Sequence, residues 1–404
     1  MILQRTYQAI IIGGGASGLL CAVELLNGEN ALFAKDVLIL ERNDRVGKKL
    51  ITTGNGQGNL MNENFGTQFY RGEKSFISAF VESTNKIDLE KYLYNLGIPL
   101  CTLSNGKKYP ISRQASAVLD IIRENLNYHG LEVKTEEYVT DISKKGDVFL
   151  VKTKNSEFYA KNVVLAVGGA CAKQFGTDGS SYKLAEKFGH VKTNLIPSLV
   201  QLKTDTSFIK GLKGLKEIAR VTALVDGKEK MTATGDLLFT DYGVSGNTIF
   251  QVSAVFSDKG NQSLKIEFLP DFSIQEVEKL IEEKLSKGYI KEQDVLTGLL
   301  VKRIAQTVQK LAKSNSAKDL AFAIKNFNLK VTGNMGFNYA QVTKGGIKTD
   351  TVNPHTMESK LKSGLYLTGE MLDVDGDCGG YNITFAFASG ILSARDIKNR
   401  LKNG

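Results

Sequence analysis

A glycine-rich turn between an expected strand and an expected helix constrains this fold more than any other feature. The apolar run at residues 9–12 has the length of a buried strand, and Gly13, Gly15 and Gly18 follow before a second apolar stretch. In a strand–turn–helix unit, the first glycine permits a tight turn and the second lets a pyrophosphate approach the backbone. The third lets the helix pack closely on the strand. The turn therefore predicts a dinucleotide-binding α/β fold, with phosphates at a helix N-terminus.

The second expected strand indicates which nucleotide is bound. It covers residues 37–41 and ends in Glu41, 23 residues after Gly18, which is close to the expected spacing of about 20. A carboxylate at this distance accepts hydrogen bonds from an adenosine ribose and repels a 2′-phosphate. FAD or NAD is therefore favoured over NADP. The alternative, a surface acid that ends a strand, leaves the glycine turn unexplained.

The pattern of expected elements changes along the 404 residues, which are too many for one ordinary domain. Strands and helices alternate up to about residue 195, as in a doubly wound sheet, with helices expected at 77–96 and 115–128. Short β-rich pieces among glycines follow, and then expected helices at 273–287, 292–313 and 317–326, the first with a Ser273–Glu276 capping box. We predict an FAD-binding domain of residues 1–195 plus 340–404, a β-barrel-like domain of 196–270 plus 327–339, and a helical subdomain of 271–326.

Composition narrows the classes of partner. The net charge is +9, but the lysines are scattered without a run of five or six like charges, so nucleic-acid binding is not expected. No apolar run approaches the about 18 residues of a membrane span, and the first strand begins too early for a signal peptide. A cytoplasmic location without membrane contact is predicted. Four cysteines form no C-x-x-C pair and three histidines lie far apart, so no metal is expected.

Three further segments favour FAD over NAD. The basic stretch after Glu41 carries Lys48 and Lys49, which could reach phosphates or stand as exposed loop lysines. The apolar strand at 163–167 ends in two glycines, which let a dinucleotide pass close to the backbone or simply form a turn. The strand at 365–367 leads to Gly369 and Glu370, a carboxylate suited to the ribityl hydroxyls of a flavin.

Two glycine-rich loops complete the expected site. A helix that starts near Tyr381, after a loop rich in glycine and aspartate, would aim its N-terminus at the flavin pyrimidine and stabilise negative charge on the reduced ring. The loop at residues 54–59, in which three glycines alternate with polar amides, can offer successive backbone N–H groups. An ordinary helix start and a solvent loop are the respective alternatives.

Several motifs together resemble one known family. They read IIIGGGASGL, LILERNDRVGKKL, TTGNG, GKKYPISRQASAVLD, TDGSSYKLAEKFGH, LLFTDYGVSG, VTKGGI and GLYLTGEMLDVDGDCGGYN. The chain resembles, almost end to end, the bacterial flavoproteins that include BaiN-type oxidoreductases and aminoacetone oxidase. The resemblance implies a two-dinucleotide-type, glutathione-reductase-like FAD domain with an inserted β-barrel and a helical bundle.

Motifs and resemblance together predict the FAD contacts. The predicted residues are Gly13, Gly15, Ala16, Ser17, Gly18, Glu41, Arg42, Lys49, Leu50, Thr53, Gly54, Asn55, Gly56, Asn59, Val139, Ala166, Gly168, Gly169, Gly369, Glu370, Asp375, Gly380, Tyr381, Asn382 and Ile383. Val139 would meet the adenine through its backbone.

The chain departs from the family pattern near the expected flavin face. Gln57-Gly58 stands where Arg-Cys is usual, Met61 where Thr is usual, and Lys344 where a small residue is usual. Phe385 and Phe387 occupy a stretch that commonly carries tryptophans. These differences leave the substrate open more than they affect FAD binding.

The resulting hypothesis is an FAD-dependent oxidoreductase that moves a hydride between a small organic substrate and flavin N5. A second G-x-G-x-x-G is absent from the sequence, so reoxidation by O2, as in a small-amine oxidase of the aminoacetone type, is the first reading. The alternatives are a BaiN-type reductase of conjugated or steroid-like rings, visited transiently by NAD(P)H, and a non-catalytic flavin-binding or RNA-associated protein. Tyr242, Lys344 and Tyr381 are catalytic candidates by position alone, each with a structural role as the alternative. The oligomeric state and any redox role of Cys378 stay open.

Overall fold

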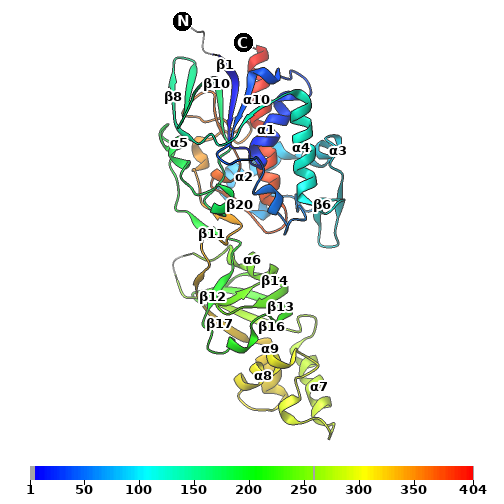
Figure 1. The fold of residues 1–404 in the computed structure, drawn as a ribbon. Coiled ribbons are helices and arrows are strands. Elements are labelled where there is room, and N and C mark those ends of the chain that lie inside the picture. Colours follow the sequence, from blue (N-terminus) through cyan, green and yellow to red (C-terminus); the bar gives the residue numbers. More distant parts are fainter. Residues whose placement is uncertain (1–4, 258–259, 404) are drawn as a thin grey trace. The chain divides into compact units, whose positions relative to one another are not determined.

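The computed structural model describes residues 5–257 and 260–403 and divides into two units. The first unit combines Met1–Ile196 with Val342–Gly404, and the second is Pro197–Gln341 (Figure 1). Each unit has its own hydrophobic core. The strands β11 (Ile196–Ser198) and β18 (Val342–Lys344) stand where the chain passes from one unit to the other.

A mostly parallel sheet forms the centre of the first unit. Its order is β7-β2-β1-β10-β9-β8, and β19 also pairs with β10. The bounds are β1 Thr6–Ile12, β2 Val37–Leu40, β7 Glu132–Lys134, β8 Val139–Lys145, β9 Val148–Thr153, β10 Glu157–Leu165 and β19 Leu365–Leu367. Strands β7, β2, β1, β10 and β19 are parallel, whereas β9 and β8 extend the sheet as antiparallel strands. All four residues of β2 are buried, as expected of a strand covered on both faces. The predicted Rossmann-type α/β fold is confirmed.

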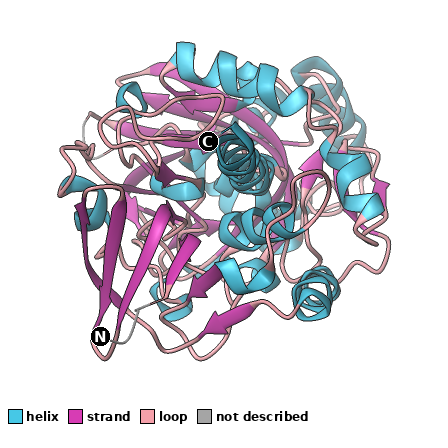
Figure 2. Cartoon of the chain, turned by 90° about the horizontal axis from the view of Figure 1, so that it is seen from above, coloured by secondary structure: helices cyan, strands magenta, loops and turns pink. Residues whose placement is uncertain are grey.

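Helices α1 (Ala16–Leu26) and α10 (Tyr381–Asn403) pack against each other beside this sheet (Figure 1). The two helices approach closely at Gly390, where a Cβ would lie only 3.1 Å from the Cys21 backbone nitrogen. In Figure 2 the C-terminus marks the end of α10, which is viewed along its axis. The unit also contains α2 Lys74–Asn85, α3 Leu89–Asn95, α4 Ala115–His129 and α5 Tyr182–Glu186.

Two small sheets in the first unit lie near the start of α10. One has the order β3-β6-β5, and the other pairs β20 with β4. Their strands are β3 Met61–Asn62, β4 Tyr70–Gly72, β5 Leu100–Thr102, β6 Lys107–Pro110 and β20 Val374–Gly376. Short 3-10 helices are η1 Ala34–Asp36, η2 Leu50–Thr52, η3 Thr67–Phe69, η4 Lys173–Phe175, η7 Thr349–Thr351 and η8 Gly369–Met371.

The second unit contains the predicted barrel as a closed sheet. Its order is β12-β15-β14-β13-β16-β17. The strands are β12 Leu202–Thr204, β13 Lys216–Val225, β14 Lys228–Phe239, β15 Gly243–Ser245, β16 Gln262–Phe268 and β17 Phe327–Asn334. The helical elements are α6 Asn247–Ser253, α7 Ile274–Leu285, α8 Lys302–Leu311, α9 Ala317–Lys325, η5 Lys210–Leu212 and η6 Glu292–Asp294. Helix α7 starts with the predicted capping box of Ser273 and Glu276. The division of the barrel from a helical subdomain stays a prediction.

Two helices expected from apolar spacing are interrupted. The stretch at 77–96 is two helices, because Asp88 takes a left-handed φ of 49° between them and caps α3 by accepting from the Lys91 N–H. The stretch at 292–313 has only the η6 turn and α8, with Gly298 between them at a φ of 91°. Both single-helix predictions were wrong, because the spacing of apolar residues carries no information about a single residue in the left-handed conformation.

Candidate functional site

The glycine turn after β1 is closely packed at two of its three motif positions. A Cβ at Gly13, whose φ is 106°, would overlap the carbonyl of Ala166, and a Cβ at Gly18 would overlap the carbonyl of Gly13. At Gly15 a Cβ would meet no atom within 4 Å. Gly13 and Gly18 therefore serve packing, while Gly15 borders open space at the start of α1.

The first turn of α1 has polar groups without protein partners. Gly15 is its N-cap and contributes no side-chain cap, so N–H groups of that turn lack a side-chain acceptor. The Ser17 hydroxyl is buried and has no hydrogen-bond partner among the described residues. A Cβ at Gly369 would lie 3.0 Å from the Ser17 Cβ, so the C-terminal part of the unit meets the turn here. The predicted residues Ala16, Ser17 and Gly369 are thus brought together.

Glu41 is held beside this turn, just after β2. Its Oε2 accepts from the Gly14 N–H at 2.8 Å, and its Oε1 accepts from the Asn43 backbone N–H at 2.8 Å and the Asn43 side chain at 2.7 Å. The side chain is buried, and Oε2 retains a lone pair for a further donor. The Glu137 N–H donates to the Glu41 carbonyl at 2.9 Å, which brings the segment leading to the predicted Val139 beside the acid.

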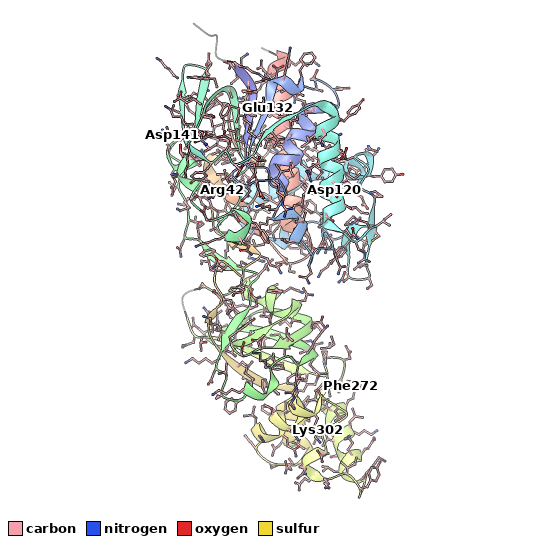
Figure 3. The ribbon with its side chains drawn as sticks, in the orientation of Figure 1. Arg42, Asp120, Glu132, Asp141, Phe272 and Lys302 are labelled. Carbon is pink, nitrogen blue, oxygen red and sulfur yellow. The ribbon has the colours of Figure 1, made fainter. Side chains whose placement is uncertain are left out.

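Arg42 is held by a hydrogen bond and by an aromatic contact with other residues of the chain. Its guanidinium donates to Asp178 at 2.9 Å and lies 4.7 Å from the centre of the Tyr138 ring (Figure 3 labels Arg42). Although burial opposes the shift, hydrogen bonds from Arg42 and Ser180 lower the pKa of Asp178 to about 2. Asp178 therefore stays ionised and keeps Arg42 near the end of β2.

Lys49 and Glu370, each predicted as a cofactor contact, form an ion pair at 2.6 Å. The other Glu370 oxygen accepts from the Thr343 backbone N–H at 2.9 Å. The Thr343 hydroxyl accepts from the N–H groups of Ala170 at 2.8 Å and Cys171 at 3.1 Å. Sequence reasoning missed Thr343, although it lies within the VTKGGI motif, because its role depends on contacts with distant segments.

Two predicted glycines follow β10, and the second of them borders this ion pair. A Cβ at Gly169 would lie 3.0 Å from the Glu370 carboxyl carbon and would overlap the Thr343 hydroxyl. Gly168 has a φ of 72°, and a Cβ there would lie 2.8 Å from the Thr177 methyl group. The segment that follows β10, strand β18 and the 3-10 helix η8 therefore meet at one place.

The loop at residues 54–59 follows η2 and has a left-handed backbone. Gly54, Asn55 and Gly56 have φ values of 58°, 55° and 83°. A Cβ at Gly54 would lie 2.8 Å from the Asn59 nitrogen. The Asn59 side-chain oxygen is buried without a hydrogen-bond partner among the described residues. Leu50 is buried in η2, and Thr53 donates its hydroxyl hydrogen to the Leu50 carbonyl at 2.8 Å.

An arginine that sequence reasoning missed fixes the loop before α10. Arg71, in β4, donates from Nε to Asp375 at 3.0 Å and also pairs with Asp377. Burial raises the pKa of Asp375, against the opposing charge of Arg71. Nothing in the sequence distinguishes Arg71 from other lone arginines, since the β4–β20 pairing that places it is non-local.

The predicted residues at the start of α10 are also fixed. The Asn382 side chain accepts from the Gly376 N–H and donates to the Gly376 carbonyl, both at 2.8 Å. The Tyr381 ring stacks on Phe69 with centroids 4.6 Å apart, and burial raises its pKa to about 12. A Cβ at Gly380 would lie 2.5 Å from the Met61 carbonyl oxygen, so this turn rests on β3.

The three catalytic candidates fall in different places. Tyr381 and Lys344 belong to the first unit. Burial raises the pKa of Asp373, and the charge of Lys344 opposes this effect. Tyr242 belongs to the second unit, in the turn between β14 and β15. Val139 is the buried first residue of β8, and Ile383 is half-buried in α10. These positions leave all three catalytic assignments as predictions.

Known proteins match this arrangement over nearly the whole chain. The model of the HI0933-like protein Rossmann domain matches residues 7–396. The chain belongs to this family. Among its relatives, the 3-dehydro-bile acid delta(4,6)-reductase of Clostridium scindens is 34% identical over 96% of this chain and 98% of its own length. The ribosomal RNA dihydrouridine synthase of Haemophilus influenzae is 27% identical over 97% and 99%, respectively.

A solved structure also aligns along the chain. The 3-ketosteroid-delta4-(5alpha)-dehydrogenase of Rhodococcus jostii RHA1 is 14% identical, with a TM-score of 0.48 over 98% of both chains. Membership of the HI0933-like family confirms the resemblance seen in the sequence, and with it the prediction of a flavin-dependent oxidoreductase enzyme. The reading as an amine oxidase is not supported, because the relatives found are named for other reactions.

The residues of this HI0933-like chain fit a flavin dinucleotide. Open space at Gly15, the buried Ser17 hydroxyl and the Glu41 carboxylate lie together at the start of α1. They match the pyrophosphate and ribose of a dinucleotide. Within residues 5–257 and 260–403, no three histidine, cysteine or carboxylate side chains gather as metal ligands, and no helix has the length and apolar character of a membrane span.

Replacing Glu41 by glutamine should weaken FAD binding about tenfold. The carboxylate accepts three N–H groups, and an amide would turn a donor toward one of them while losing charge for the ribose. Fluorescence titration of the apoprotein with FAD measures the change. The exposed Glu82→Gln variant is the control, and equal affinity of both variants would show that Glu41 is not a cofactor contact.

Proposed function

We propose that this protein binds FAD and reduces a carbon–carbon double bond conjugated with a carbonyl group, using electrons from NAD(P)H. The observation that carries the proposal is the chemistry shared by the names of its near full-length relatives. A delta(4,6)-reductase acting on a 3-dehydro bile acid saturates a double bond in conjugation with a ketone. Dihydrouridine forms when the ring double bond of uridine, next to a carbonyl, is saturated. Both reactions therefore add hydrogen across a double bond next to a carbonyl group, and they differ only in the substrate.

A ring ketone of small-molecule size is the preferred substrate. The bile-acid reductase is the more similar of the two named relatives, at 34% against 27% identity. The second candidate is a uridine in RNA, and the net charge of +9 is the observation in its favour. The scattered distribution of the lysines argues against it.

The residues of the first unit have separable tasks in this proposal. The N–H groups and Ser17 at the start of α1 would bind the pyrophosphate, and Glu41 would accept from the adenosine ribose. Glu370, oriented by Lys49 and Thr343, would accept from the ribityl chain. Arg71 holds the loop before α10 through Asp375, and the N-terminus of α10 would stabilise negative charge on the reduced ring. When bound, the flavin supplies hydride transfer at N5.

Anaerobic stopped-flow absorbance tests the proposed function. FAD-loaded protein is mixed with NADH, NADPH or aminoacetone, and the reduced protein is then mixed with cyclohexenone, keto-ene steroids or a ribosomal RNA transcript. We expect a nicotinamide to bleach the flavin and a keto-ene to restore its colour. Restoration by RNA alone would select the second candidate. Bleaching by aminoacetone alone, with colour restored by air, would overturn both.

A further inference from the structure

Thr343 lies at the centre of a hydrogen-bond network that joins three segments of the first unit. It is 1% exposed in β18, and its backbone N–H donates to one oxygen of Glu370 at 2.9 Å. Its hydroxyl oxygen accepts from the N–H groups of Ala170 at 2.8 Å and Cys171 at 3.1 Å, in the segment after β10. One residue therefore holds both the segment after β10 and the carboxylate of η8.

The hydroxyl group of Thr343 keeps a hydrogen that no described residue accepts. A threonine hydroxyl has one hydrogen to donate and two lone pairs, and the two N–H groups use both lone pairs. Within residues 5–257 and 260–403, the hydroxyl hydrogen has no acceptor. A buried donor of this kind costs free energy unless an acceptor reaches it, and a bound ligand can supply one.

Gly169 shows that this hydroxyl and the Glu370 carboxylate border the same space. A Cβ at Gly169 would overlap the Thr343 hydroxyl oxygen and would lie 3.0 Å from the Glu370 carboxyl carbon. A carboxylate has about four lone-pair sites, of which the Thr343 N–H and the Lys49 ammonium use one each. The two groups together therefore offer a ligand one donor and further acceptor sites.

This combination selects one part of the dinucleotide. A hydroxyl group both donates and accepts, so it matches a donor and an acceptor that stand together. The pyrophosphate offers only acceptors and carries negative charge, which a carboxylate repels. The adenosine ribose also has hydroxyls, but it is expected at Glu41, just after β2. The ribityl chain, with its row of hydroxyls, is therefore the part that fits Thr343 and Glu370.

We propose that the Thr343 hydroxyl binds FAD directly, donating its hydrogen to a ribityl hydroxyl oxygen while Glu370 accepts from the same chain. This inference rests on the FAD binding of the proposed function. It assigns to Thr343 a contact with the cofactor in addition to the orientation of Glu370.

Binding measurements on the apoprotein test this contact without any turnover. Thr343→Val removes the hydroxyl while nearly keeping the shape of the side chain, and Thr343→Ser keeps the hydroxyl. The matched control is Ser359→Ala, outside the predicted FAD contacts. The Ser359 hydroxyl is also buried, and it accepts the backbone N–H groups of Leu361 at 3.1 Å and Lys362 at 3.0 Å. Each protein is titrated with FAD by flavin fluorescence and with ADP by calorimetry, and its thermal unfolding is followed without ligand.

We expect Thr343→Val to bind FAD about tenfold more weakly than wild type but ADP within about twofold, because ADP has no ribityl chain. Thr343→Ser should bind FAD within about threefold of wild type. Ser359→Ala should lose stability, as Thr343→Val does, because both leave two N–H groups without their acceptor, yet it should keep wild-type affinity for FAD. Three results would each overturn the inference: wild-type FAD affinity in Thr343→Val, equal losses for FAD and ADP, or a Thr343→Ser variant as weak as Thr343→Val.

Analogues of FAD that each lack one ribityl hydroxyl test the contact from the side of the ligand and need no variant to fold. The wild type should bind at least one of them about tenfold more weakly than FAD. Equal affinity for FAD and for every analogue would overturn the inference alone. A wild-type apoprotein that binds neither FAD nor ADP would overturn the proposed function instead.

Discussion

The Gly15→Ala variant is expected to bind FAD about 10- to 100-fold more weakly while its apoprotein keeps wild-type stability. A Cβ at this position meets no protein atom within 4 Å, and the backbone has an ordinary φ of −84°. The methyl group would instead occupy space that a pyrophosphate needs against the helix N-terminus. Loss of one charge-assisted hydrogen bond costs about 1.5–3 kcal/mol, which is about 10- to 100-fold in affinity.

Titration of the apoprotein with FAD and thermal unfolding without FAD measure the two quantities separately. The matched control is Gly18→Ala, whose Cβ would overlap the carbonyl of Gly13 and which should lower the stability of the apoprotein as well. If Gly15→Ala binds FAD as tightly as wild type, the dinucleotide does not lie on this turn. If its apoprotein loses as much stability as Gly18→Ala, the glycine serves packing alone.

Local sequence was sufficient to predict the nucleotide turn. The motif glycines follow a continuous apolar strand, and the structure places each where a strand–turn–helix unit requires it. The place of Glu41 beside the turn was predictable from its position at the end of the second strand, and its carboxylate accepts from the Gly14 N–H, while its contact with a ribose stays a prediction. The barrel was also visible, as short β pieces among glycines, and β12 to β17 close into one sheet.

Non-local contacts explain what the sequence could not provide. Lys49 and Glu370 were each predicted as flavin contacts, but their 2.6 Å ion pair joins segments 321 positions apart. Arg71 became visible only through the pairing of β4 with β20. Asp88 and Gly298 ended expected helices by taking left-handed conformations, which the spacing of apolar residues does not encode. The first hypothesis, an amine substrate, gave way to a conjugated ketone for a related reason. No local motif in the sequence distinguishes these two classes of substrate.

The Glu24→Leu variant should destabilise the first unit by about 3 kcal/mol. Glu24, on α1, pairs with Lys398 of α10 at 2.8 Å, and both side chains are buried. Lys398 also donates to the Asn27 carbonyl at 3.0 Å, while Arg395 contacts Glu24 at 3.3 Å from a more exposed position. Removing Glu24 leaves the Lys398 ammonium buried without its counter-charge, which costs about 3–5 kcal/mol.

Urea unfolding, followed by circular dichroism, measures this loss against two controls. The double variant Glu24→Leu/Lys398→Met removes both charges and should recover most of the stability, since a matched apolar pair replaces the buried ion pair. Glu82→Leu breaks an exposed pair with Lys86 and should change stability by less than about 1 kcal/mol. A double variant no more stable than Glu24→Leu would refute the electrostatic explanation. Because α1 carries the glycine turn at its other end, the buried pair fixes the helix whose N-terminus is proposed to bind FAD, and Glu24→Leu should also weaken FAD binding.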